Sequence, residues 1–131
     1  MNREIKFRGR RVDTGEWVCG YYYHDQKFKN GYSCQDVYII RDELDQDFEV
    51  DPATVGQFTG LRDRNGTEIY EGDILVYEMK DTTVYGLVVW EDEGWRVTWT
   101  DGWKNWLAEV HDINMVVGNR WDHPELLEKT N

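Results

Sequence analysis

Hydrophobic and polar residues alternate along much of this chain, and the pattern predicts a protein built mainly of β-strands. Trp95, Val97 and Trp99 alternate with polar residues, and Ile5 and Phe7 do the same near the start. A period of two places the apolar side chains on one face of a strand. Both segments are therefore expected to be half-buried strands.

The central stretch from Val55 to Tyr77 organises the predicted fold. Two apolar runs, residues 55–61 and 74–77, flank turn signals at Asn65-Gly66 and Gly72-Asp73. Glycine adopts positive φ without steric cost, and we expect this of the second glycine, where the chain turns into the second run. The stretch predicts a strand, turn, strand unit in the middle of a small barrel.

Further strands are expected on both sides of this unit, at residues 16–24, 37–41, 84–91 and 113–117. The runs Ile74–Tyr77 and Leu87–Trp90 are rich in β-branched and aromatic residues, which favour strands. We expect these two runs to pair in one antiparallel sheet.

The strand expected at residues 16–24 has a face of four larger side chains: Trp17, Cys19, Tyr21 and Tyr23. Cys19 is expected on that face as a small core residue. Polar residues from Asp25 to Gln35, with a turn signal at Asn30-Gly31, predict a loop. The acidic segment from Asp42 to Asp51 predicts another exposed stretch.

The C-terminal segment predicts a short helix from Pro124 to Lys129. Pro124 suits a first helical turn, where a missing N–H costs nothing, and Asp122 with Glu125 has the spacing of a capping box. The two leucines of this helix, Leu126 and Leu127, are expected to pack onto the barrel.

Three blocks of this sequence resemble the YopX family: residues 3–9 with 14–18, residues 58–61 with 69–74, and residues 116–119 with 124–127. The central block is the most specific, with Phe-Thr-Gly-Leu at 58–61 and Ile-Tyr-Glu-Gly-Asp-Ile at 69–74. The resemblance implies an all-β, mainly antiparallel fold, namely an SH3-like small barrel with an N-terminal hairpin and a short C-terminal helix. It also implies a phage or prophage origin. It brings no catalytic residues.

Length and composition favour one folded domain over residues 1–131, because 40% of the 131 residues are hydrophobic and only two are proline. No apolar run approaches the length of a membrane helix, and the N-terminus lacks the apolar core of a signal peptide. We therefore expect the protein in the cytosol of the cell that makes it. Cys19 and Cys34 are then two reduced thiols, with a disulfide between them as the alternative.

The formal net charge of −11 disfavours direct binding to nucleic acid, whose affinity rests on neutralising phosphates. The charge is unevenly spread, since seven acidic residues lie in the segment 36–51. Five basic residues form a strip near the N-terminus: Arg3, Lys6, Arg8, Arg10 and Arg11. We expect this strip to pair with the acidic segment.

No catalytic, metal or cofactor site is predicted. His24, His111 and His123 each have a carboxylate as chain neighbour, but no two of them share a helix or strand face. The segment Asp63–Gly66 has its glycine at the fourth position, whereas a calcium loop needs it at the sixth. Phosphate-binding loops and nucleophile elbows are absent from the sequence.

Two candidate interaction surfaces remain, one aromatic and one acidic. Trp103 and Trp106 are expected to be exposed on a helical turn because polar residues flank them, whereas Trp95 and Trp99 are expected in the core. The acidic candidates are Asp42, Glu43, Asp45 and Asp47.

Three functions are weighed. The first is a non-enzymatic protein-interaction module serving as a phage or prophage accessory protein. The alternative is an acidic nucleic-acid mimic or inhibitor of a host DNA-binding protein, and the third is an enzyme of unrecognised type. The partner in the first case is a phage or host protein, with homo-oligomerisation left open.

Overall fold

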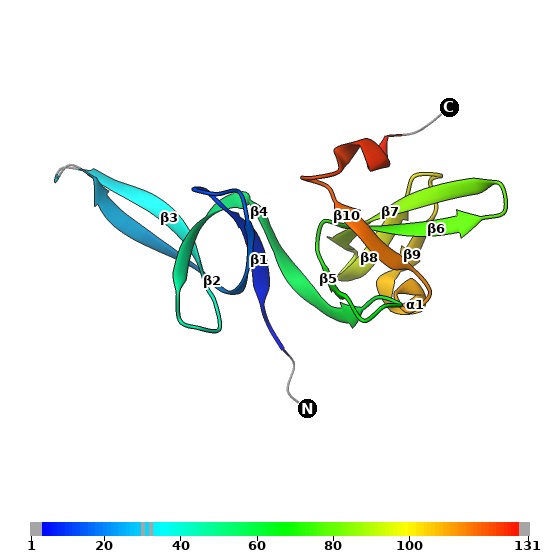
Figure 1. Cartoon of the computed structure of the whole chain (residues 1–131), viewed down its shortest axis with the longest axis horizontal. Coiled ribbons are helices and arrows are strands. Elements are labelled where there is room, and N and C mark those ends of the chain that lie inside the picture. The colour runs from blue at the N-terminus through cyan, green and yellow to red at the C-terminus, as the bar shows by residue number, and fades with distance from the viewer. Residues whose placement is uncertain (1–3, 30, 32, 129–131) are drawn as a thin grey trace. The chain divides into compact units, whose positions relative to one another are not determined.

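The computed structural model describes residues 4–29, 31 and 33–128, and almost all of its regular structure is antiparallel β (Figure 1). The predicted all-β fold with a small barrel is confirmed. The strands are β1 (Phe7–Arg11), β2 (Trp17–Lys29), β3 (Ser33–Arg41), β4 (Asp47–Arg62), β5 (Glu68–Tyr70), β6 (Asp73–Met79), β7 (Thr82–Glu91), β8 (Gly94–Trp99), β9 (Lys104–Trp106) and β10 (Met115–Asn119). The helical elements are α1 (Leu107–Val110) and a 3-10 turn, η1 (Pro124–Leu127).

The chain divides into two compact units, Met1–Gln57 and Phe58–Asn131. Strand β4 runs through the boundary, so its first part belongs to the first unit and its last residues to the second. Within the described residues, no helix has the length and apolar composition needed to cross a membrane. Whether the two units behave as one domain stays a prediction.

The first unit contains a closed barrel of four strands. β1 pairs with β2, β2 with β3 and β3 with β4, and β4 closes the circuit by pairing with β1. Closure removes sheet edges, which in an open sheet would offer unpaired N–H and C=O groups. The barrel core includes Val37, Ile40 and Val50, all buried.

Strand β2 turns a corner of this barrel at Gly20. Its pairing with β1 ends at Phe7↔Gly20, and its pairing with β3 begins at Tyr21↔Arg41. Gly20 has a φ of +154°, and a Cβ there would collide with the backbone carbonyl of Arg41. Only glycine fits a corner of this kind.

The corner explains why the predicted face of β2 is wrong. Cys19 and Tyr21 are exposed, so Cys19 is not a core residue. Beyond the corner the other face turns inward, where Tyr22 packs on Phe7 with ring centroids 5.7 Å apart. One face of a strand stays buried along its length only while the strand keeps the same neighbouring strands.

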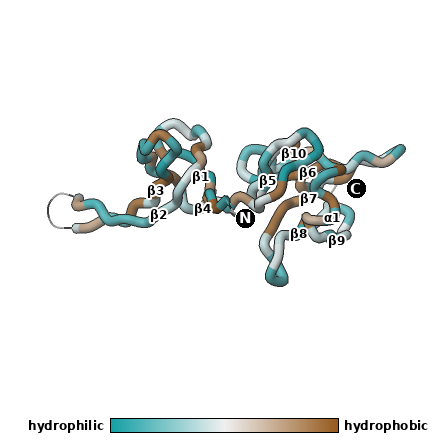
Figure 2. The backbone as a smooth tube through the Cα atoms, turned by 90° about the horizontal axis from the view of Figure 1, so that it is seen from below, coloured by the Kyte–Doolittle hydropathy of each residue, from teal (hydrophilic) through white to brown (hydrophobic). Residues whose placement is uncertain are grey.

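The polar loop predicted at residues 25–35 is also wrong, because β2 and β3 form a long hairpin. Their pairing runs from Tyr21↔Arg41 to Lys29↔Ser33, and Gly31 in the turn has a φ of +73°. Asn30 lies outside the described residues. The outer hairpin is mostly hydrophilic (Figure 2), with side chains exposed on both faces, so it lacks the one-sided pattern by which strands are recognised.

The second unit holds a five-stranded antiparallel sheet in the order β10-β6-β7-β8-β9. Ile74↔Leu87 and Tyr77↔Val84 are register pairs of β6 and β7, which confirms that the two predicted runs lie on neighbouring antiparallel strands. The register joins Ile74–Tyr77 mainly to the first half of β7. The core cluster of this unit is Ile69, Leu75, Val84, Val88, Val97, Trp99 and Leu107.

The turn into β6 confirms the prediction for Gly72, whose φ is +90°. Its N–H donates to the Val88 carbonyl, and its own carbonyl accepts from Arg120 N–H, both at 2.9 Å. A Cβ on Gly72 would also collide with the Trp121 ring. This position needs glycine both for its backbone geometry and for space.

Several predicted boundaries need correction. Ile5 is exposed and precedes β1, and the segment 42–51 is not one loop, because β4 already begins at Asp47. The last strand spans Met115–Asn119 rather than residues 113–117. The sequence does not reveal these strand ends, because the mainly apolar run at 113–117 and the acidic run at 42–51 each continue from a loop into a strand without a change in composition.

The predicted C-terminal helix is a single 3-10 turn in the described part of the chain, and its N-cap is His123 rather than Asp122. Asp122 instead accepts a hydrogen bond from Asn119 Nδ2 at 3.0 Å, which ties it to the preceding turn. Leu126 and Leu127 are half-buried.

Candidate functional site

The predicted surface residues lie in different units of the structure. Asp42, Glu43 and Asp45 form the turn between β3 and β4, and Asp47 is the first residue of β4. The two tryptophans belong to the second unit. The acidic and aromatic candidates are therefore described separately.

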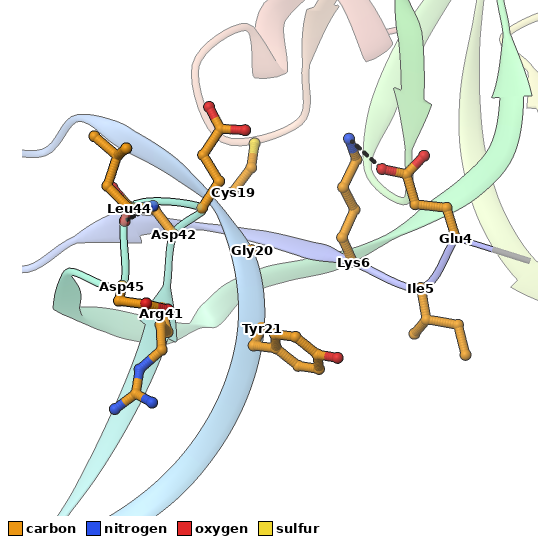
Figure 3. Close-up of a pocket in the computed structure, with 11 residues that line it drawn as sticks. Glu4, Ile5, Lys6, Cys19, Gly20, Tyr21, Arg41, Asp42, Leu44 and Asp45 are labelled. Atoms are coloured by element: carbon orange, nitrogen blue, oxygen red, sulfur yellow. Dashed lines mark hydrogen bonds and ion pairs between the residues drawn. The ribbon is translucent and has the colours of Figure 1, made fainter.

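The acidic turn (Asp42, Glu43 and Asp45) lines an open pocket of about 530 Å³ in the first unit. Figure 3 shows its other walls, which come from the segment before β1, from β2 around Gly20 and from Arg41. Lys6 Nζ lies 3.2 Å from Glu4 Oε1 at one side of this pocket.

Much of the acidic segment is used for structure. Asp42 Oδ1 accepts hydrogen bonds from the N–H groups of Leu44 and Gln46, at 3.0 and 2.9 Å, and so shapes the turn. Arg41 donates to Asp47 at 2.8 Å, and the Tyr23 hydroxyl donates to it at 3.0 Å. The hydrogen bonds from Arg41 lower the pKa of Asp47 below its ordinary value.

The basic strip meets aromatic rings as well as acids. The guanidinium groups of Arg8 and Arg10 lie over the Trp17 ring, at 5.0 and 5.2 Å from its centroid. Arg11 pairs with Asp13 at 2.7 Å rather than with the acidic segment. Arg3 lies outside the described residues.

The tryptophan predictions agree with the structure on burial but not on local geometry. Trp99 is buried, Trp95 is half-buried against the core cluster, and Trp103 and Trp106 are exposed. The helical turn predicted for the last two is wrong, because Lys104–Trp106 forms β9 and pairs with β8. The three-residue spacing of Trp103 and Trp106 comes from a turn followed by a strand, not from a helix.

Trp103 and Trp106 have different surroundings. Trp106 is 41% exposed, it covers Gly94, and the guanidinium of Arg96 lies 4.3 Å from its ring centroid. Trp103 is 75% exposed. Its backbone N–H donates to Asp101 Oδ1 at 3.1 Å, but its ring contacts no cation or aromatic ring among the residues described.

Trp103 lines a groove of about 280 Å³ in the second unit, the Trp103 groove. Buried Val84 and Trp99 contribute to its lining, while Tyr77, Met79 and Ile113 are exposed apolar side chains along it. The remaining lining residues are Asp101, Asn105, Val110 and Asn114. An exposed apolar surface of this kind marks an interaction site more often than single exposed residues do.

Sequence reasoning missed Tyr77, Met79 and Ile113 as surface residues. Tyr77 and Met79 flank Glu78 at the end of β6, beyond the fully buried run Asp73–Val76. The sequence signal for this surface is the pair of apolar residues at the end of the strand, beyond its buried part. Ile113 was assigned to a strand, and only the structure places it beside the groove.

Each of the three histidines makes a hydrogen bond with a different partner. His24 Nε2 lies 3.0 Å from Asp36 Oδ1 across the hairpin, and His111 Nδ1 donates to the Arg62 carbonyl at 2.7 Å. His123 Nδ1 accepts from Asn119 N–H at 3.3 Å. Among the residues that the structure describes, no three His, Cys, Asp or Glu side chains gather as a metal site would require.

Asp63 is a structural carboxylate rather than a cation ligand. Its Oδ1 accepts from Asn65 and Thr67 N–H groups at 2.8 and 2.9 Å, and its Oδ2 accepts from Val116 N–H at 2.9 Å. Burial alone would raise the pKa of Asp63, but these backbone hydrogen bonds and nearby Arg64 outweigh it and lower that pKa. The carboxylate thus joins the central turn to β10.

The closed barrel and the five-stranded sheet define a small all-β protein with an open pocket at the acidic turn and an exposed aromatic groove at Trp103. The chain belongs to the YopX family, since the family model described as YopX protein matches residues 6–128. No curated protein matches this chain.

Among solved structures, the chain is similar to the crystal structure of protein EF1440 from Enterococcus faecalis. The two are 24% identical, the match covers 97% of this chain and 100% of that one, and the TM-score is 0.57. This likeness shows a shared fold.

Proposed function

We propose that this protein is a non-enzymatic protein-interaction module that binds its partner through the Trp103 groove. The observation that carries the proposal is the exposed ring of Trp103 beside exposed Tyr77, Met79 and Ile113. Tryptophan and tyrosine are enriched at the energetic centres of interfaces because they bury large areas at low entropic cost.

The resemblance to YopX proteins supports a role as an accessory protein of a phage or prophage. The partner is a phage or host protein in the cytosol. Two exposed free thiols, Cys19 and Cys34, suit a reducing compartment of that kind.

The acidic alternative rests on Glu43 and Asp45, exposed carboxylates for which the described residues provide no hydrogen-bond or ion-pair partner. A negative surface there would occupy a basic cleft of a DNA-binding protein. Several neighbouring carboxylates are engaged within the fold, Asp42, Asp47 and Glu49 among them, which leaves few charges for such mimicry.

Affinity capture from infected cells tests both ideas, with four proteins compared at low and high salt. These are the wild type, Trp103→Ala, the matched aromatic variant Trp106→Ala, and the double variant Glu43→Gln with Asp45→Asn. Each captured partner is then purified, and its Kd for the four proteins is measured by calorimetry.

If the groove binds the partner, Trp103→Ala weakens binding at least ~30-fold, because interface anchors contribute about 2 kcal/mol or more. Trp106→Ala and the acidic double variant then bind like the wild type. A loss confined to the acidic variant, with strong weakening by salt, favours the mimic instead. Identical partners and affinities for all four proteins would contradict both proposals.

A further inference from the structure

The polar groups of the Trp103 groove indicate what kind of group binds there. Asn105 Oδ1 is occupied, because it accepts the indole N–H of Trp99 at 2.8 Å. Asn114 donates from Nδ2 to the Val110 carbonyl at 2.9 Å, but its Oδ1 has no partner in the described structure. Asn114 is only 2% exposed.

The Asn114 Oδ1 oxygen is buried and out of reach of a ligand's donor, so it does not serve a bound group. The acceptor that a bound group can reach is exposed Asp101, which lines the groove. One of its oxygens accepts Trp103 N–H, and no cation pairs with the carboxylate within the described ranges. Its chain neighbour Lys104 is held by Glu91, with Nζ and Oε1 2.7 Å apart. The Asp101 carboxylate is therefore available to a cationic donor from a partner.

Within the described residues, guanidinium groups cover some of the chain's other partly exposed aromatic rings, although not all of them. A guanidinium lies over five of them at 4.3–5.8 Å from the ring centroid: Trp106 under Arg96, Phe48 under Arg11, Trp17 under Arg8 and Arg10, Trp121 under Arg120, and Tyr23 under Arg41. Trp103, the most exposed of the tryptophans, has no such cover from the described residues.

We propose that the Trp103 groove binds an arginine side chain of the partner protein. The guanidinium stacks on the Trp103 ring and donates to the Asp101 carboxylate, while the aliphatic stem lies against Tyr77 and Met79. The inference rests on the proposed function and names the chemistry of the partner.

Arginine fits this groove better than lysine. Its planar guanidinium stacks on aromatic rings and offers five donors in fixed directions, whereas an ammonium is a compact and strongly hydrated charge. The net charge of −11 favours the approach of a basic segment over long range.

The test uses three peptides that differ only in their central side chain. Acetyl-Leu-Arg-Leu-amide is titrated into the full chain, in parallel with the same peptide carrying citrulline, a neutral isostere of arginine. Chemical shifts of the Trp103 indole N–H and the Asn114 side-chain amide report occupation of the groove. Acetyl-Leu-Lys-Leu-amide distinguishes a guanidinium from an ammonium.

We expect the arginine peptide to bind at least ~5-fold more tightly than the citrulline peptide, since a cation over an indole contributes about 1 kcal/mol and the ion pair with Asp101 adds to it. Asp101→Asn keeps the hydrogen bond from Trp103 N–H but removes the charge, and it should reduce this preference by the part that the ion pair contributes. Asp112→Asn removes an exposed charge outside the groove lining and should leave the preference unchanged.

Equal binding of the arginine and citrulline peptides, or no shift at Trp103 with either, would overturn the arginine proposal. The proposed function and the arginine proposal can be distinguished by their variants. If Trp103→Ala abolishes partner binding while Asp101→Asn leaves it intact, the groove is an interaction site and its occupant is not arginine.

Discussion

At the scale of single residues, the central stretch depends on two positions whose roles are geometric rather than hydrophobic. Gly72 closes the turn into β6 between the Val88 carbonyl and Arg120 N–H. Asp63 holds three backbone N–H groups from two segments of the chain, the central turn and β10. Gly72 lies in the block that most closely resembles YopX proteins, and Asp63 lies between the two parts of that block.

We expect Gly72→Ala to lower the free energy of unfolding by about 2 kcal/mol or more, because strain at positive φ adds to a collision with Trp121. Gly60→Ala is the matched control, since Gly60 has a φ of +86° with no atom within 4 Å of the added Cβ. It should cost about 1 kcal/mol, from backbone strain alone. Denaturant melts measure both.

A Trp121→Ala background separates the two causes. There the loss from Gly72→Ala should fall to that of Gly60→Ala. Equal losses for the two glycine variants in the wild-type background would show that the Trp121 ring moves aside freely.

The depressed pKa of Asp63 predicts an acid-sensitive turn. A group whose pKa is lower in the folded state stabilises the fold above its unfolded pKa of about 3.9, and that contribution disappears as pH falls from there through the folded pKa. Asp63→Asn places an amide N–H against Val116 N–H and should cost about 1–3 kcal/mol at pH 7.

Unfolding free energies of the wild type and Asp63→Asn, measured from pH 7 to pH 2.5, test this prediction. The difference between the two proteins should shrink below about pH 4. Asp112→Asn, which removes an exposed carboxylate, controls for net charge and should follow the wild type. A difference that stays constant over the whole range would mean that Asp63 does not contribute through its ionised form.

At the scale of elements, the sequence predicts best those strands that bury one face. The runs within β6, β7 and β8 were recognisable because each carries apolar residues toward a core. The outer hairpin of β2 and β3 buries neither face, so its sequence pattern predicts a polar loop instead of two strands. The corner at Gly20 could not be foreseen either, because the change of pairing partner depends on residues far away in the sequence.

The same reasoning explains the outcome for the candidate site. Trp103 was predicted as exposed because polar residues surround it, and local sequence is sufficient for that inference. The groove beside it combines residues from β6, from the turn before β9 and from the segment after α1. Such a combination depends on tertiary structure, and no periodicity along the chain encodes it.

The β7–β8 hairpin offers a prediction at this scale. Its two-residue turn places Asp92 and Glu93 at φ values of 55° and 65°, a geometry that normally selects Asn-Gly. Glu93→Gly should therefore stabilise the protein by about 1 kcal/mol in a thermal or denaturant melt. Glu93→Gln removes the same charge but keeps the strain, so an equal gain from that variant would assign the effect to charge repulsion.

At the scale of the whole molecule, the question is whether the two compact units unfold together. Strand β4 belongs to both, because it closes the barrel in the first unit and pairs with β5 in the second. The first unit is also small, and few of its side chains are fully buried. A core of that size seldom sustains a fold by itself. We therefore propose that the chain unfolds as one cooperative domain.

Paired core substitutions test this cooperativity. Ile40 in the barrel and Ile74 in the sheet are both fully buried, and Ile→Val at either site should cost about 1 kcal/mol. Six of the seven tryptophans lie in the second unit, so their fluorescence reports mainly on it, while a dye on exposed Cys19, in a Cys34→Ser background, reports on the first.

If the protein is one domain, each substitution shifts the midpoints of both probes equally, because loss of β4 from one sheet removes it from the other. If Ile40→Val shifts only the dye transition and Ile74→Val only the tryptophan transition, the two units are separate domains joined by a shared strand.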